Sequence, residues 1–180
     1  MFMQNEKQIW TIGHSTRSLE ELIEILNSFQ IELLADVRSY PGSRKFPWFN
    51  KDNLQNEIPS HGIEYTHIAK LGGRRKFSKD SKNIAWRHPA FRAYADYMET
   101  EDFAEGIKEL IALASAKRVV YMCSEAVWWR CHRSLISDYL KVRGWKVNHI
   151  MGKDLSKEHP YTGAATIQEG KVRYDIVKPE

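Results

Sequence analysis

The fold is decided by the stretch RVVYMCSEAVWWRCHRSLISDYLKVRG, residues 118–144. It opens with a β-rich apolar run, Val119 to Met122, of the length expected for a buried strand. Apolar residues then recur at helical spacing from Leu135 to Leu140, and Gly144 stands where a helix C-cap glycine belongs. The turn between them holds two cysteines, a glutamate, a histidine and two arginines. Because ligands of α/β folds bind where a strand feeds a helix, this turn predicts a functional site.

Upstream, the pattern predicts a strand, a helix and a second strand within about thirty residues. The first strand covers residues 8–13, and the helix has Ser18 as its N-cap with Glu21 as the capping-box partner. The second strand covers residues 33–37. This βαβ unit predicts a parallel pairing of its two strands.

The later elements follow from the same signals. Residues 39–50 hold two prolines and four aromatic residues, which predicts a long ordered loop rather than a regular element. The other predicted elements are a helix from Asn50 to Glu57 ended by Pro59, a strand over 63–68, a helix from Pro89, a helix near Asp102 with Glu105 as capping partner, a strand over 146–151, and a hairpin over 165–177 turning at Glu169-Gly170. The prediction is one α/β domain, residues 1–180 with a core at about 9–151, in which helices flank a mainly parallel sheet and a β-hairpin ends the chain.

Composition narrows the class of protein. The 180 residues are 42% hydrophobic, as expected of a packed globular domain. No run approaches the roughly 20 apolar residues of a membrane span, and the polar N-terminus has no signal-peptide pattern. We therefore expect a cytoplasmic protein without a membrane partner, whose Cys123 and Cys131 are thiols. Glycine-rich dinucleotide and P-loop motifs do not occur in the sequence, and no cofactor is expected.

The net charge of +4 is unevenly distributed. Between Lys70 and Arg92 there are eight basic residues and a single acidic one, Asp80. Phe77 and Trp86 are interleaved with these charges, so this basic block can contact phosphates and stack on bases. A solvated basic loop without a ligand explains the same pattern.

Polar or glycine residues follow the predicted strands, and the C-terminal ends of parallel strands share one edge of a sheet. The residues at or just after these ends are His14-Ser15, Asp36-Val37-Arg38, Gly72-Gly73, Cys123-Ser124-Glu125 and His149 to Gly152. We therefore expect residues that are far apart in the sequence to converge on one crevice.

Several of these blocks together resemble the signature of a bacterial family, the domain of unknown function 488. The resemblance covers residues 9–151 and rests on TIGHS (11–15), DVR (36–38) with Pro41 and Ser43-Arg44, Phe49-Asn50, LGGRR (71–75), CSE (123–125) and RCHR (130–133). It implies a compact cytosolic α/β domain and no particular activity. The sequence departs from the family pattern at Pro59, where similar chains continue a helix, and at Val127-Trp128-Trp129.

Three kinds of chemistry fit the crevice. Cys123 is a candidate nucleophile, because neighbouring cations and a helix N-terminus favour its thiolate; a buried, inert cysteine is the alternative. Metal binding has donors in the cysteines and histidines but no recognised ligand spacing, and nearby arginines oppose a cation, so no metal is expected. Anion recognition is favoured by arginines in the same blocks together with the N-terminus of the helix near Cys131; structural arginine–carboxylate pairs are the alternative.

The sequence thus predicts an enzyme, a hydrolase or transferase with a thiol or acid/base site, that binds a phosphate-bearing or otherwise anionic substrate such as a nucleotide or nucleic acid. The candidates for catalysis are Cys123, Glu125, Asp36 and His132. The candidates for substrate binding are His14, Ser15, Arg38, Arg44, Arg74, Arg130 and Arg133. The alternative is a non-catalytic nucleic-acid-binding module that uses the basic block, residues 70–92.

Overall fold

The computed structural model describes residues 6–180; the first five residues of the predicted domain and of the polar N-terminus lie outside this range. Its strands are β1 (Gln8–Gly13), β2 (Leu33–Asp36), β3 (Glu64–His67), β4 (Val119–Cys123), β5 (Lys146–Gly152), β6 (Leu155–Glu158), β7 (Thr166–Gln168) and β8 (Lys171–Arg173). Its α-helices are α1 (Leu19–Ser28), α2 (Lys51–Ser60), α3 (Pro89–Tyr97), α4 (Glu101–Ala116) and α5 (Arg133–Val142). Three short 3-10 turns are η1 (Pro47–Phe49), η2 (Ala69–Leu71) and η3 (Trp128–Arg130).

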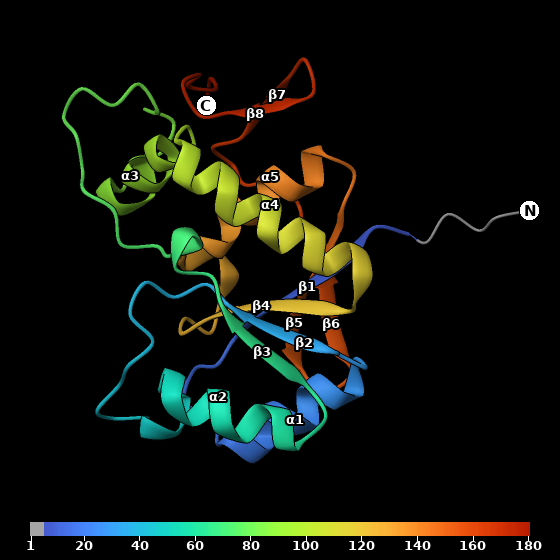
Figure 1. Ribbon diagram of the computed structural model, residues 1–180. Helices are drawn as coiled ribbons and strands as arrows, with labels where there is room; N and C mark the ends of the chain where they lie inside the picture. Colours follow the sequence, from blue (N-terminus) through green and yellow to red (C-terminus); the bar gives the residue numbers. More distant parts are fainter. Residues whose placement is uncertain (1–5) are drawn as a thin grey trace, which may run out of the picture.

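Six strands form one sheet in the order β3-β2-β4-β1-β5-β6, in which only β6 runs antiparallel to its neighbour. Helices α1 and α2 cover one face, and α3, α4 and α5 cover the other (Figure 1). The strands β7 and β8 make a separate C-terminal hairpin. The predicted α/β fold, with a mainly parallel sheet between helices and a terminal hairpin, is confirmed.

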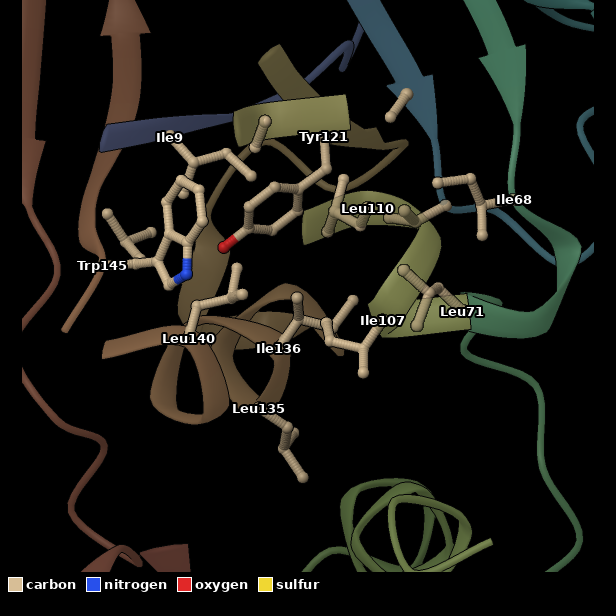
Figure 2. Close-up of a cluster of buried hydrophobic side chains, with 14 of the residues drawn as sticks. Ile9, Ile68, Leu71, Ile107, Leu110, Tyr121, Leu135, Ile136, Leu140 and Trp145 are labelled. Atoms are coloured by element: carbon tan, nitrogen blue, oxygen red, sulfur yellow. The ribbon is translucent and has the colours of Figure 1, made fainter. Parts of the chain in front are cut away.

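The two faces of the sheet follow from side-chain alternation along the strands. In β1, Ile9 packs with the helices α3, α4 and α5, while Trp10 packs with α1 and α2. Figure 2 shows the first of these cores, where Tyr121 and Trp145 lie among aliphatic side chains of α4 and α5. Burying a core side chain of this size contributes about 1.5–3 kcal/mol. Both faces of the central strands are therefore buried, as expected of parallel sheets.

Local signals set most helix ends. Ser18 accepts a hydrogen bond from the Glu21 amide, and Glu21 bonds the Ser18 amide in return, which is the predicted capping box. Gly144, just after α5, has φ of +87°, a conformation that favours glycine. The hairpin turns at Glu169 and Gly170, both with positive φ as a type I′ turn requires.

Four expectations are corrected. β1 and β2 are parallel but do not pair, because β4 lies between them and bonds both. Pro59 was expected to end α2 after Glu57, but the helix includes the proline and ends at Ser60. Thr100, not Asp102, caps α4, through its Oγ1 and the Phe103 amide. Finally, the antiparallel strand β6 was not predicted; its four residues are all exposed and carry no apolar alternation.

Candidate functional site

A crevice of about 900 Å³ opens at the C-terminal edge of the sheet, above β1, β2 and β4. The helix that follows β1 covers one face of the sheet and the helix that follows β4 covers the other, so the chain diverges between these strands. Ligands of open α/β sheets bind at such a point. The predicted site residues that line the crevice are His14, Ser15, Arg38, Arg74, Cys123, Glu125, Arg130 and His132.

Arg38 and Asp36 form a buried ion pair on the β2 side of the crevice. Arg38 Nε donates to Asp36 Oδ1 at 2.8 Å, and its terminal nitrogen donates to Oδ2 at 2.6 Å. Tyr65 adds a third bond to the same carboxylate at 2.6 Å. Asp36 is fully buried, whereas Arg38 still reaches the crevice. Asp36 therefore orients Arg38 and does not itself line the crevice.

His14 sits beside Arg38 as a neutral imidazole. Its Nδ1 donates to the Ser15 carbonyl at 2.9 Å, so its Nε2 is free to accept from Arg38 at 3.3 Å. Burial lowers the pKa of His14 to about 4, and the nearby Arg38 charge acts in the same direction. The ring stacks on Phe49 with centroids 4.1 Å apart. His14 thus fixes the position of Arg38 rather than adding charge to the crevice.

The floor of the crevice is formed by two thiols. Cys123, the last residue of β4, and Cys131, between η3 and α5, place their Sγ atoms 3.1 Å apart. Both are free and almost completely buried, with 3% and 8% of their surface exposed. Both cysteines also belong to the lining of the crevice.

Arg133 lies directly beneath these sulfurs and is 1% exposed. Its Nε is 3.0 Å from Cys123 Sγ and 3.3 Å from Cys131 Sγ. One terminal nitrogen donates to Thr11 Oγ1 at 2.9 Å and the other to the Glu125 carbonyl at 2.6 Å. No carboxylate among the described residues forms an ion pair with Arg133. A thiolate in the pair is therefore the nearest available negative charge.

The two thiols differ in acidity. Burial alone raises the pKa of Cys131, but the hydrogen bond from Cys123 and the Arg133 charge outweigh it and lower that pKa to about 6. Burial and the hydrogen bond to Cys131 raise the pKa of Cys123 well above its usual range. Cys131 also lies at the start of α5, where the helix dipole favours an anion. The thiolate was expected at Cys123; the hydrogen bond from Cys123 and the position at the start of α5 favour it at Cys131.

A chain of buried hydrogen bonds holds Arg133 from behind. This chain, here called the relay, starts at Thr11, which contacts Arg133, and runs through His149 and His159 to Asp138. Its three distances are 2.7 Å (Thr11–His149), 2.8 Å (His149–His159) and 2.8 Å (His159–Asp138). Because the Asp138 carboxylate accepts, His159 donates to it through Nε2. With one hydrogen on each ring, His159 Nδ1 accepts from His149 Nε2, and His149 Nδ1 accepts from the Thr11 hydroxyl. The bonds of the relay thus run in one direction, from Thr11 to Asp138.

Asp138 ends the relay as a fully buried, well-satisfied carboxylate. Besides His159, it accepts bonds from the amide and hydroxyl of Thr162 and from the Tyr174 hydroxyl at 2.8 Å. Thr162 and Tyr174 belong to the C-terminal tail. The relay therefore ties the tail to the crevice floor through α5.

His132, the N-cap residue of α5, forms part of the crevice wall. Its Nε2 donates to the Val37 carbonyl at 2.8 Å, which leaves Nδ1 with a lone pair. Burial lowers the pKa of His132 to about 4, assisted by Arg133. A Cβ on Gly73 would come within 2.5 Å of His132 Nδ1, so glycine permits this close approach. His132 is thus a neutral base candidate.

Two sequence-based expectations for the arginines and acids are corrected. Arg133 was expected to face the crevice as an anion ligand, but it lies under the thiols because its position in the first turn of α5 faces the sheet. Glu125, a candidate for catalysis, lines the crevice, but its carboxylate makes no ion pair within residues 6–180, and only its backbone carbonyl holds Arg133. Arg44 is exposed on the 39–50 loop and does not line the crevice.

The basic block 70–92 is partly neutralised by contacts within the protein. Lys70 pairs with Glu105, Lys82 with Glu99, and Arg75 stacks on Tyr97 with its guanidinium carbon 3.4 Å from the ring centroid. Arg74 differs, because it has no acidic partner in the described part of the chain and faces the crevice.

Sequence reasoning missed Thr11, His159, Asp138 and the role of Cys131. Alternation in β1 places Thr11 on the same side as Ile9, toward α5, and would have indicated a polar group facing the core. Ser134, Ser137 and Asp138 recur at helical spacing and are all buried. That polar stripe was the available signal for Asp138, whereas no local pattern indicated His159.

Residues 6–180 contain neither a metal-ligand cluster nor a membrane-spanning helix. No group of three or more His, Cys, Asp or Glu side chains is placed to hold a metal ion. Within the same range, no helix combines the length and apolarity needed to cross a bilayer.

Comparison with known proteins gives one relationship. Searches of curated proteins and of solved structures return no significant match. The sequence profile of the family described as "Domain of unknown function DUF488" matches residues 18–140, which include α1 to α4, the thiol pair and most of α5. Because this match spans more than half of the chain, the protein belongs to the DUF488 family, whose function is unknown.

Proposed function

We propose that the protein is an enzyme that binds a nucleotide or a short single-stranded nucleic-acid segment in the crevice and acts on it with the Cys131 thiolate. The observation that carries the proposal is a pair of guanidinium groups, Arg74 and Arg130, that face the crevice without an acidic partner among the described residues. Glu125 is the one acidic residue in the described lining. Uncompensated guanidinium groups in a concave site suit phosphate, because their paired donors match its oxygens.

The rim of the crevice favours a ligand that also carries a flat ring. Tyr40 is 75% exposed and Trp129 is 50% exposed, and both line the crevice. Arg74 lies over the Tyr40 ring at 5.6 Å. Stacking of a base on an exposed aromatic side chain contributes about 1–3 kcal/mol per base. Phosphate contacts and stacking together support a nucleotide over inorganic phosphate.

The candidate catalytic groups are a thiolate at the floor of the crevice and two groups that can transfer protons. Cys131 has the lowered pKa of a thiolate nucleophile. His132 has a pKa of about 4, and within residues 6–180 its Nδ1 makes no hydrogen bond and the Glu125 carboxylate at the rim makes no ion pair. These groups can accept or donate the protons that a hydrolase or transferase reaction moves. Free thiols of this kind suit a reducing compartment such as the cytoplasm.

The non-catalytic alternative depends on the basic block. Its Lys70, Lys82 and Arg87 pair with carboxylates, so the charge available for a phosphate backbone falls to Arg74, Arg75, Lys76, Lys79 and Arg92. A block reduced in this way supports an extended nucleic-acid surface less well than the sequence suggested.

The test measures binding of adenosine monophosphate and of a fluorescent single-stranded oligonucleotide to the wild type and to four variants. We expect the double variant Arg74→Ala/Arg130→Ala to raise the Kd at least tenfold, as loss of two charge-assisted contacts implies. Arg143→Ala is the matched control, because Arg143 follows the far end of α5, about 15 Å from its start. Cys131→Ser should bind normally.

Three results would contradict the proposal: no binding of either probe, an equal loss in Arg143→Ala, or unchanged binding in the double variant. Loss of binding only in Lys76→Ala/Lys79→Ala would instead favour the basic-block module. Turnover of a bound nucleotide that survives in Cys131→Ser would remove the thiolate from the mechanism while leaving the binding site in place.

A further inference from the structure

The thiol pair has a geometry that nucleotide binding alone does not require. The Sγ atoms of Cys123 and Cys131 are 3.1 Å apart, and a disulfide bond has a sulfur–sulfur distance of about 2.05 Å. Closing the gap therefore needs a movement of about 1 Å. The residues between the cysteines include Ser124, Glu125 and Ala126, which are exposed. The side chains of this segment are therefore outside the core, while its backbone is bonded to Ser15 at Ser124 and to Arg133 at Glu125.

Arg133 places a fixed positive charge beside both sulfurs. It lies within hydrogen-bonding distance of both, at 3.0 Å from Cys123 and 3.3 Å from Cys131, and it cannot withdraw because Thr11 and the Glu125 carbonyl hold it. A fixed cation favours one thiolate in the pair and opposes protonation of both sulfurs. The pair thus combines a nucleophilic sulfur with a resolving thiol in contact with it, which is the arrangement that redox-sensing cysteines use.

We propose that Cys123 and Cys131 are an oxidation site, at which a hydroperoxide converts the two thiols into a reversible intramolecular disulfide. In the first step the Cys131 thiolate attacks one peroxide oxygen and the O–O bond breaks. The leaving hydroxide or alkoxide takes a proton from water, and Cys131 becomes a sulfenic acid. In the second step the Cys123 sulfur attacks the Cys131 sulfur, the S–O bond breaks, and the departing hydroxyl leaves as water with the Cys123 proton.

Overall, two thiols lose two electrons and the hydroperoxide gains them. Reduction by an external dithiol reverses the change through a mixed disulfide. Both cysteines line the crevice, which is the route by which a small peroxide would approach them. The oxidised pair carries no thiolate, so the crevice floor loses its nucleophile and its negative charge at the same time. This inference does not depend on the proposed nucleotide chemistry, since the reaction needs no substrate in the crevice.

The experiment treats the full chain with a small excess of hydrogen peroxide and follows its intact mass. The chain contains only these two cysteines, so the readout is unambiguous. We expect the loss of two hydrogens per chain, no labelling by N-ethylmaleimide, and recovery of two labelled thiols after dithiothreitol. Peptide mapping should join the peptides of Cys123 and Cys131 from the same chain.

Two matched variants assign the steps. Cys123→Ser should stop at the sulfenic acid, which dimedone traps on Cys131. Cys131→Ser should react more slowly at pH 7, because burial, the largest cause of the raised Cys123 pKa, remains in this variant. If either variant fails to fold, the wild-type rate still decides the matter: it should rise with pH through about 6, well below the usual thiol pKa of about 8.5.

The proposal is overturned by unlinked sulfinic or sulfonic acids, by disulfides between chains only, or by thiols that survive the peroxide. Because these measurements use no nucleotide, they are separate from the binding test of the proposed function. A protein that forms the disulfide but binds no nucleotide would support the oxidation site and contradict nucleotide binding. A protein that binds nucleotide but forms no disulfide would contradict the oxidation site alone.

Discussion

His149 donates its Nε2 hydrogen to Nδ1 of His159, 2.8 Å away, in a region where the two side chains are 0% and 1% exposed. Trp128 stacks on His149 with an angle of 4° between the rings, which closes the pair off from the crevice. The relay leaves no acceptor for a second hydrogen on His149. Burial, the neighbouring His159 and Arg133 together lower the pKa of His149 to about 2.

Acid should destabilise the fold well above the range in which most carboxylates titrate. His14 and His132 have pKa values of about 4 in the folded state and His149 about 2, against 6.5 when unfolded. The unfolded chain therefore binds more protons below pH 6.5, so stability is complete above that pH and falls as the pH drops. Each imidazole should remove about 2 kcal/mol between pH 6.5 and 5. Urea unfolding at several pH values measures the slope.

The matched control for this slope is His61→Gln, which removes an exposed histidine after α2. It should unfold with the same pH dependence as the wild type. A free energy of unfolding that stays flat from pH 6.5 to 5 would show that the buried imidazoles are protonated without cost.

Asp138→Asn should loosen the C-terminal tail. The carboxylate accepts bonds from His159, Thr162 and Tyr174, and an amide replaces one of its acceptor oxygens with a donor. We expect a loss of about 3–5 kcal/mol, as for a broken buried charged network, and faster proteolysis of residues 159–174. Asp175→Asn, which affects a surface pair with Arg173, should leave the free energy of unfolding close to that of the wild type. Equal proteolysis of the two variants would argue against the tie.

Arg133→Ala should lower the free energy of unfolding. The side chain is 1% exposed and satisfies Thr11, the Glu125 carbonyl and both sulfurs, so its removal leaves a cavity and unpaired polar atoms. We expect a loss of more than about 3 kcal/mol in urea unfolding. Arg74→Ala removes the same kind of side chain from an exposed position and should stay within about 0.5 kcal/mol of the wild type. A folded, stable Arg133→Ala protein would contradict the buried position of this arginine.

Gly13→Ala should disturb the crevice floor. A Cβ at this position would lie 1.6 Å from the Glu125 carbonyl oxygen and 2.9 Å from a terminal nitrogen of Arg133, so the backbone of the β4 loop would have to move. We expect destabilisation of about 3 kcal/mol or more, together with faster alkylation of Cys131. Gly42→Ala is the control, since nothing lies within 4 Å of a Cβ there. Similar melting temperatures for the two variants would contradict the contact.

The fold was predictable where short-range chemistry determines it. The capping box of Ser18 and Glu21, the glycine after α5 and the Glu169-Gly170 turn are each local, and each is confirmed. The insertion of β4 between β1 and β2 is not local, because it depends on which strand edges meet in the finished sheet. For the same reason β6 escaped prediction: an exposed polar strand is defined by its hydrogen bonds to β5 and not by an apolar pattern.

The position of the site was predictable from the sequence, but the orientation of its side chains was not. Convergence of strand ends followed from parallel topology, and eight of the eleven named residues line one crevice. The direction of each side chain did not follow. Arg133 and Arg130 are close in sequence, yet one lies under the sheet edge and the other faces solvent. A turn of this kind changes direction at every residue, so periodicity cannot assign an inside and an outside to it.

The tie between Asp138 and the tail also sets an order of events during synthesis. Asp138 leaves the ribosome before His159, Thr162 and Tyr174, which supply its hydrogen-bond donors. Until those residues emerge, the carboxylate must keep its water, because burying it alone would cost several kcal/mol. The nascent chain therefore cannot close α5 onto the sheet in its final form when the helix is complete. Residues 159–174 therefore complete the packing of α5 onto the sheet after the preceding elements have been synthesised.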